Sequence, residues 1–312
     1  MRSICRFTLA ALVFVLAPLS AAAAHDNVSD SFVITGVRVF DGSQVIPSAT
    51  VVVHNGRIKA VGADVVVPSG IPVIDGTGST LLPGFIDSHA HAWTRQELER
   101  AIQFGVTTEM DMWSDPQFVA STSREQKRNG APYRADHFSA INPATTPEGY
   151  PYNFTPDFVE TPTLSSPAEA KGFVKDLAKA GANHLKIMLE DGIGFGFETE
   201  VLTRATVKAL TEEAHKRGML AVAHVTKRKY ASWGIQDGVD GLVHSFIDEL
   251  ADPAFIQLAV DNGIFVVGTL SVEESFVTTE GGASLIADPD LGPYLTEQEK
   301  QWLLTLSGRG HR

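Results

Sequence analysis

From residue 81 onward, short apolar segments alternate with amphipathic ones, and this alternation constrains the fold most strongly. The amphipathic stretches include "PAEAKGFVKDLAKAG" and "EVLTRATVKALTEEAHKRG". The apolar, β-branched segments lie near residues 82–90, 105–112, 136–141, 184–189, 219–225, 239–245 and 263–269. Strand–helix repetition at this pace predicts parallel βα units and a sheet that helices cover. The sequence therefore predicts an α/β fold with seven parallel strands.

The first 24 residues form a different kind of sequence. A short basic start, "MRSICR", precedes the apolar run "FTLAALVFVLAPLS", and "AAAA" before His25 offers small residues for cleavage. This pattern predicts a secretory signal peptide over residues 1–24. Pro18 interrupts the apolar run before it reaches the length of a membrane span. We therefore expect a periplasmic or secreted protein without a membrane span after signal cleavage.

Residues 25–80 predict a small β-rich module ahead of the main domain, residues 81–312. The segments "SFVITGVRVFDG" and "ATVVVHNGRIKAVG" alternate or run apolar, and each ends at a glycine-containing turn. Two long segments of the main domain, 114–136 and 141–165, are rich in Pro, Gly or Tyr and are interpreted as loops. Loops of this length beside a regular scaffold are expected to form the substrate walls.

Charge and cysteine content narrow the possible functions. The formal net charge is −12 and the sequence contains no basic stripe, so nucleic acid is not an expected partner. The single cysteine, Cys5, lies in the predicted signal peptide, which leaves the exported chain without disulfides or thiol chemistry. Any metal site must then use histidine, carboxylate or modified lysine ligands.

The segment "LLPGFIDSHAHAW", residues 81–93, places two histidines at the end of the first main strand. Alternate residues of a strand face the same side, so Asp87, His89 and His91 are expected to point one way. Two imidazoles so placed can bind one metal ion through their ring nitrogens, although H-x-H alone is a weak signal. Asp87 is interpreted as an acceptor for the second N–H of a metal-bound imidazole.

Three further polar side chains follow or interrupt later apolar strands. They are Lys186 in "HLKIML", His224 in "VAHVT" and His244 in "LVHSF". In a parallel barrel the reactive groups gather at the carboxyl ends of the strands, so we expect these three to meet the histidine pair in one cavity. A buried lysine is costly unless its charge is paired or chemically changed. For His184, two residues before the lysine, core filling is the expected role.

The ordered motifs resemble those of a known enzyme superfamily. "PGFIDSHAH", "GVTT", "GANHLKI", "AHV" and "GVDGLVH" are similar to motifs of the metal-dependent amidohydrolase superfamily, in its imidazolonepropionase- and prolidase-like branch. The resemblance runs from about residue 33 to residue 270. It implies a (β/α)8-type TIM barrel with a β-sandwich built from both chain ends, of which the N-terminal module would be one part.

The resemblance also implies a two-metal centre. His89 and His91 would bind the first divalent ion, and His224 and His244 the second, with zinc as the expected metal. Lys186 would be carboxylated and would bridge the ions, since a lysine carbamate is an anion with two oxygens. Such metals acidify a bound water and polarise a carbonyl. The implied activity is cleavage of a C–N bond in a small-molecule amide, peptide or cyclic amide by metal-activated hydroxide.

The sequence departs from the family pattern near its end. The family's general-base aspartate ends the eighth strand in a Gly-Thr-Asp setting, whereas here Leu270 follows Gly268 and Thr269 at the seventh strand. The main domain is therefore expected to be an incomplete barrel, truncated after a helix over residues 296–306. Loss of a general base lowers turnover by about 10²–10⁴-fold, and unpaired strand edges lower stability. A chain extended through strand eight is expected to be more stable and more active.

Three functions stay open at this point. The first is an exported C–N hydrolase, and the second is a lactone or ester hydrolase of the same fold. The third is a truncated, catalytically silent metal-binding protein. A homo-oligomer, or completion of the barrel by another copy or a partner, is a further open expectation.

Overall fold

The structure, a computed structural model, describes residues 30–129, 133–151, 161–277 and 281–306. The chain divides into two compact units, Met1–Pro83 and Gly84–Arg312. The predicted signal peptide lies outside the described residues. In the part of the chain that is described, no helix combines the length and apolar character that a bilayer crossing requires.

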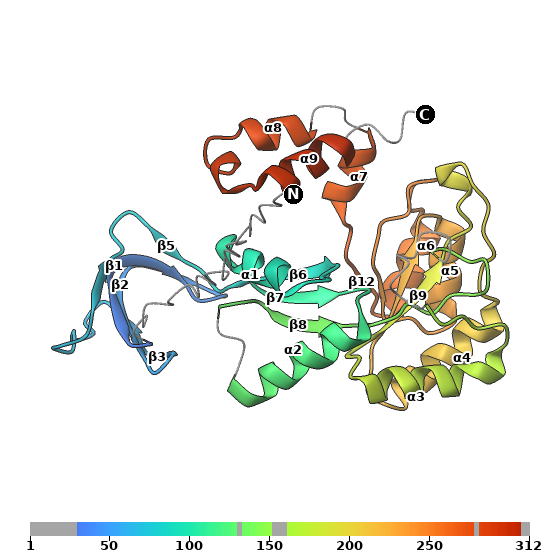
Figure 1. Ribbon diagram of the computed structural model, residues 1–312, viewed down its shortest axis with the longest axis horizontal. Coiled ribbons are helices and arrows are strands. Elements are labelled where there is room, and N and C mark those ends of the chain that lie inside the picture. Colours follow the sequence, from blue (N-terminus) through green and yellow to red (C-terminus); the bar gives the residue numbers. More distant parts are fainter. Residues whose placement is uncertain (1–29, 130–132, 152–160, 278–280, 307–312) are drawn as a thin grey trace, which may run out of the picture. The chain divides into compact units, whose positions relative to one another are not determined.

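The first unit contains a five-stranded sheet (Figure 1). Its strands are β1 Phe32–Phe40, β2 Val45–His54, β3 Arg57–Gly62, β4 Val73–Asp75 and β5 Thr80–Leu81. β1, β2 and β3 pair antiparallel, and β4 and β5 run parallel to β1. Asn55 and Gly56 form the β2–β3 turn with positive φ values of 51° and 66°, as a two-residue hairpin of this type requires. The second sheet of the predicted sandwich is not found among the described residues.

The second unit contains seven parallel strands in two sheets, ordered β6-β7-β8 and β12-β11-β10-β9. They are β6 Phe85–Ala90, β7 Val106–Asp111, β8 Asp136–Ser139, β9 Leu185–Leu189, β10 Ala221–Val225, β11 Gly241–Leu242 and β12 Phe265–Val266. Each lies inside one of the seven segments predicted from the apolar pattern, so the strand positions are confirmed.

The two sheets do not close into a barrel within the described residues. β8 and β9 are joined by isolated contacts, such as the main-chain N–H of Asn183 donating to the Ser139 carbonyl at 2.8 Å. β6 and β12 are edge strands, and Phe85, Ile86 and Val266 are 56%, 62% and 58% exposed. The structure therefore establishes a mixed α/β fold, and the closed (β/α)8 barrel stays a prediction.

Helices cover the strands of this unit. They are α1 Arg95–Gln103, α2 Pro116–Asn129, α3 Ala170–Ala180, α4 Arg204–His215, α5 Arg228–Gln236, α6 Pro253–Asp261, α7 Leu270–Val277, α8 Gly281–Ala287 and α9 Glu297–Leu306. α1 packs on β7, α2 on β8, and α4 and α5 on β10 (Figure 1). β9 and β10 are buried along their whole length, and their apolar side chains form the main core with those of α3, α4 and α5.

The prediction of a loop over residues 114–136 was wrong, because most of this segment forms α2. Asp115 precedes the helix and its Oδ1 accepts the main-chain N–H of Phe118 at 2.8 Å, while Pro116 occupies the first turn. Both features favour a helix start. Val119 is fully buried, so tertiary packing stabilises a segment whose other residues are mostly polar.

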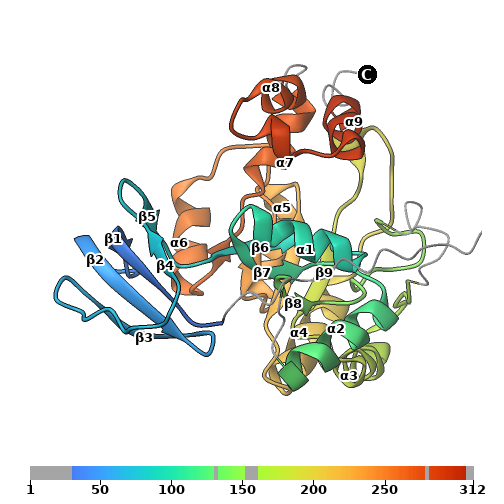
Figure 2. The same ribbon diagram turned by 60° about the vertical axis from the view of Figure 1, so that its left-hand side comes forward.

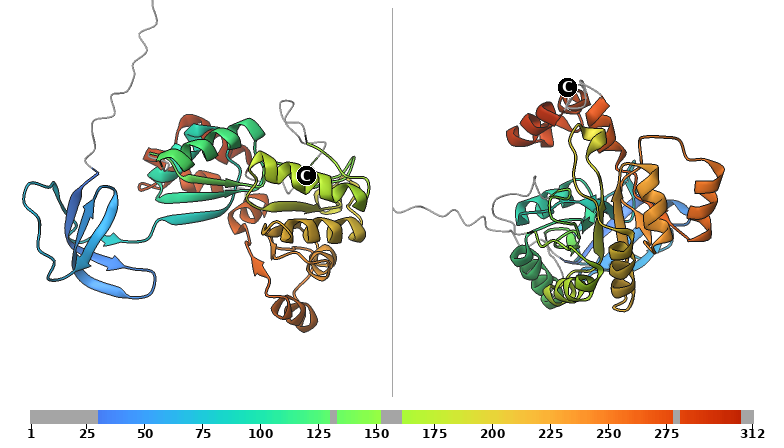
Figure 3. Two further views of the ribbon diagram at one scale, coloured as in Figure 1. Left: turned by 90° about the horizontal axis from the view of Figure 1, so that it is seen from below. Right: turned by 90° about the vertical axis from the view of Figure 1, so that its right-hand side faces the viewer.

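The three C-terminal helices α7, α8 and α9 form one group, drawn in red in Figures 2 and 3. α9 agrees with the helix predicted for residues 296–306. Arg100 of α1 makes an ion pair with Glu299 of α9 at 2.9 Å and donates to the Tyr294 carbonyl. This contact attaches the end of the described chain to the first helix of the unit.

Candidate metal centre

The structure brings all five predicted ligands together on one cavity of about 470 Å³. His89, His91, His224 and His244 line it from the carboxyl-terminal regions of β6, β10 and β11, and Lys186 lines it from near the start of β9. The ring centroids of His89 and His91 are 5.5 Å apart, those of His89 and His244 4.5 Å, and those of His224 and His244 4.4 Å. These five residues therefore form a compact histidine–lysine cluster.

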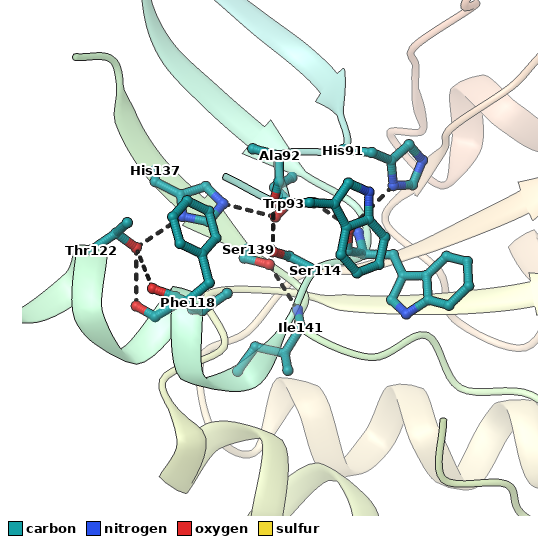
Figure 4. A network of polar contacts seen from close by, with 12 residues as sticks. His91, Ala92, Trp93, Ser114, Phe118, Thr122, His137, Ser139 and Ile141 are labelled. Atoms are coloured by element: carbon teal, nitrogen blue, oxygen red, sulfur yellow. Dashed lines mark hydrogen bonds and ion pairs between the residues drawn. The ribbon is translucent and has the colours of Figure 1, made fainter. Parts of the chain in front are cut away.

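In the histidine pair at the end of β6, His91 presents one ring nitrogen for coordination. Nδ1 of His91 lies 3.3 Å from the Trp113 carbonyl oxygen (Figure 4). A carbonyl can only accept, so Nδ1 carries the proton and Nε2 keeps its lone pair. Oδ1 of Asp87 accepts the main-chain N–H of His89 at 3.0 Å, and its role as an acceptor behind a metal-bound imidazole stays a prediction.

The other two histidines are held from neighbouring strands. Nδ1 of His244 lies 2.7 Å from Oγ1 of Thr269, which follows β12 and also lines the cavity. His224 is 6% exposed, and its ring lies 5.2 Å from that of Tyr150. Thr269, after β12, and Tyr150, between β8 and β9, therefore contact the two rings.

Burial lowers the pKa values of these side chains. Lys186 is 2% exposed, and burial lowers the pKa of its amine from 10.5 to about 7, with the Asp111 charge opposing the shift. The pKa values of His89, His91, His224 and His244 are all lowered, first by burial and then by neighbouring positive groups such as Lys186. Neutral imidazoles carry the lone pairs that bind metals, so the cluster is in the ligand form at neutral pH.

The residues fit a metal ion chemically, although the rings are not preassembled around one. Within the described residues, no group of three or more His, Cys, Asp or Glu side chains is arranged to hold an ion. The four rings of the cluster instead meet in tilted or edge contacts. However, Nδ1 of His89 is buried and makes no hydrogen bond. Buried polar atoms are costly when unsatisfied, and a bound cation on neighbouring lone pairs would relieve that cost.

The sequence-based interpretation missed a buried network through His137 and Thr122 (Figure 4). Oδ2 of Asp111 lies 2.7 Å from Nε2 of His137, and Nδ1 of His137 lies 2.9 Å from Oγ1 of Thr122. Oδ1 of Asp111 accepts the main-chain N–H of Trp113 at 2.9 Å. The network ties β7, β8 and α2 together. The position of Asp111 at the end of its strand was the sequence signal for a functional role. Its partner His137, however, lies 26 residues away in the sequence.

Glu190 was also missed. It ends the strand of Lys186 and is 1% exposed. Its Oε1 accepts the main-chain N–H of Gly192 at 2.7 Å, and its Oε2 accepts the Thr226 hydroxyl. Burial raises the pKa of this carboxyl. The sequence contained a signal for Glu190, because strand alternation places residues 186, 188 and 190 on one face, the face of Lys186. His184, the next inward position, is 4% exposed without a hydrogen bond, which agrees with core filling.

The rest of the cavity wall is mainly apolar and aromatic. Its side chains include Trp93, Met112, Trp113, Pro143, Tyr150, Pro151, Met188 and Val272. Pro143, Tyr150 and Pro151 come from the predicted wall segment 141–165, of which residues 152–160 lie outside the described part. Among the described lining residues Glu273 of α7 is the one carboxylate, and burial raises its pKa.

Comparison with known proteins finds partial sequence relatives. No family model matches it. Urease subunit alpha 1 of Streptomyces avermitilis is 28% identical over 180 residues, which cover 54% of this chain and 29% of the relative. Dihydroorotase of Mycobacterium tuberculosis is 44% identical over 62 residues, 20% of this chain and 14% of the relative. The chain thus matches less than a third of the length of either relative.

Solved structures show the same fold. A Xaa-Pro dipeptidase with bound methionine in the active site superimposes with a TM-score of 0.64 at 20% identity, over 88% of this chain and 73% of that one. The sequence relatives support the metal-dependent amidohydrolase superfamily for this chain, and the solved structure shows the shared fold.

Proposed function

We propose that this protein is an exported metal-dependent hydrolase that cleaves a C–N bond in a small amide, peptide or cyclic amide. The observation that carries the proposal is the convergence of four neutral histidines and one buried lysine on a single cavity. The superfamily contains hydrolases of such bonds, including the relatives named above. In this proposal the seven parallel strands are those of a (β/α)8-type barrel.

Four histidines and Lys186 would hold two divalent ions, zinc being the expected metal. Ions bound there would supply Lewis acidity and acidify a water molecule. The histidines contribute neutral nitrogen donors, because burial suppresses their protonation.

Lys186 contributes through its uncharged amine. With a pKa of about 7, a large fraction of the amine is neutral at neutral pH. The nitrogen lone pair can then attack the carbon of CO2, forming an N–C bond and releasing one proton to give a carbamate anion. This reaction converts a costly buried cation into a bidentate anionic ligand, which the resemblance to the superfamily also implies.

The wall of the cavity determines what can approach the cluster. A volume of about 470 Å³ lies within the usual range for small-molecule sites, roughly 300–1,000 Å³. Trp93, Trp113 and Tyr150 offer flat apolar surfaces beside the histidines. We therefore propose a substrate in which an apolar or aromatic group adjoins the scissile amide.

The experiment is a hydrolysis assay on the zinc-loaded protein with N-acyl amino acids, apolar dipeptides and cyclic amides, run beside matched esters and lactones. We expect turnover of at least one C–N substrate and its loss in His89→Asn. Exclusive turnover of esters or lactones would favour the C–O alternative. A zinc-loaded protein with no turnover on the whole panel would instead identify a silent metal-binding protein.

A further inference from the structure

A buried carboxylate lies behind one of the proposed ligands. Oε2 of Glu190 is 3.6 Å from Nε2 of His224, and both side chains are less than a tenth exposed. The two residues end adjacent parallel strands, β9 and β10, whose paired residues include Met188 with His224. Glu190 therefore faces the ring from the neighbouring strand.

Two hydrogen bonds that do not involve His224 hold the Glu190 carboxylate in place. The main-chain N–H of Gly192 donates to Oε1 at 2.7 Å, and the Thr226 hydroxyl donates to Oε2. A second contact fixes the same loop, because Oδ2 of Asp191 accepts from Nζ of Lys227 at 2.8 Å and from the Tyr230 hydroxyl at 3.0 Å. A preorganised acceptor of this kind can orient a ligand without moving.

The ring of His224 has one nitrogen directed at this acceptor. Nε2 is buried and makes no hydrogen bond, and 3.6 Å exceeds hydrogen-bond length by a few tenths of an ångström. Such contacts are often long in ligand-free sites and shorten when the site is filled. An ionised carboxylate can only accept, so it favours the tautomer with the proton on Nε2 and the lone pair on Nδ1.

We propose that Glu190 is a positioning residue that holds His224 in the Nε2–H tautomer and leaves Nδ1 as the metal-binding nitrogen. The proposal rests on the proposed function only for its metal. Acceptors behind metal-bound histidines fix the tautomer, and their loss typically lowers metal affinity by about 10–100-fold. The competing role is purely structural, in which Glu190 only anchors the loop after β9 through Gly192 and Thr226.

Glu190→Gln separates the two roles because it keeps the shape of the side chain. The amide oxygen can still accept from Gly192, and the amide nitrogen can donate to the Thr226 hydroxyl. That nitrogen then also faces Nε2 of His224 as a donor, so the variant favours the opposite tautomer. Asp191→Asn is the matched control, because it weakens the ties of the adjacent residue to Lys227 and Tyr230 and leaves Glu190 in place.

The first measurement is zinc affinity of the full chain by competition with a chelating dye, beside thermal unfolding in chelator. We expect Glu190→Gln to lose about 10–100-fold in affinity for one zinc ion with an unchanged metal-free melting temperature. Asp191→Asn should lower the melting temperature and keep the affinity. Wild-type affinity in Glu190→Gln, or equal losses in both variants, would overturn the proposal.

The second measurement needs no metal. Nitrogen-15 NMR of the histidine rings in the metal-free protein should show His224 protonated on Nε2 in the wild type and on Nδ1 in Glu190→Gln. An Nδ1–H tautomer in the wild type would refute the role of Glu190 even if the protein binds no zinc. Absence of zinc binding with the expected tautomers would refute the proposed function and leave the positioning intact.

Discussion

Replacing Lys186 by Met should stabilise the metal-free protein at neutral pH. Lys186 is 2% exposed, and burial outweighs the opposing charge of Asp111 in setting its pKa, so its ammonium form is poorly compensated. Methionine is unbranched and apolar, and it can fill the space of the lysine stem without a charge. The substitution therefore removes the cost of burying the ammonium and keeps most of the packing.

The magnitude follows from the pKa. Lowering it from 10.5 to about 7 corresponds to roughly 5 kcal/mol against the charged form below pH 7. Local relaxation and water entry reduce such penalties, so we expect a gain of about 2–4 kcal/mol in the free energy of unfolding at pH 6. Between pH 7 and pH 10.5 the unfolded chain binds more protons at this lysine than the folded one. Wild-type stability therefore rises with pH in that window, and the advantage of the variant disappears.

The assay is urea unfolding of both proteins in CO2-free buffer with chelator, at several pH values from 6 to 10. The reasoning predicts a difference that is largest at pH 6 and close to zero at pH 10. A variant less stable than the wild type at pH 6, or a difference that does not change with pH, would refute it. Either result would mean that the folded protein compensates the ammonium.

Two further predictions concern packing and buried polar contacts. Asp111→Ala should lower the free energy of unfolding in urea by about 2–4 kcal/mol, because it leaves buried His137 without its acceptor. The control His215→Ala breaks a more exposed histidine–aspartate pair and should cost less than about 1 kcal/mol. Equal costs for the two variants would contradict this prediction. Gly241→Ala should lower the free energy of unfolding by about 1–3 kcal/mol, since a Cβ would lie 2.3 Å from the Phe265 ring. The control Gly172→Ala has open space on α3 and should be neutral or stabilising by up to about 1 kcal/mol. A neutral Gly241→Ala in thermal unfolding would count against the β11–β12 packing.

The strands of the second unit could be predicted from sequence because their signal is local. β9 and β10 show it most clearly, because both are apolar segments followed by amphipathic helices and both are buried along their whole length, as central parallel strands require. α2 could not be predicted in the same way. Most of its residues are polar, and its stability comes from Val119 in the core and from the Asp115 cap, which appear only in the folded chain.

The ligand cluster was predictable for the same reason, since parallel topology alone carries residues at strand ends to one edge. The residues around it were less predictable, because their roles depend on side-chain direction. Asp87 follows the strand alternation, yet its carboxylate accepts from the main chain of His89. Glu190 and His137 act through partners 36 and 26 residues away, and no local pattern specifies such pairs.

The most direct test of the two-metal centre is elemental analysis of the purified protein and of Lys186→Ala, each after dialysis against trace-metal-free buffer. The account predicts about two divalent ions per wild-type chain, zinc foremost, and the loss of at least one in the variant. A wild-type chain that carries no divalent ion, even after zinc is supplied with CO2, would contradict it.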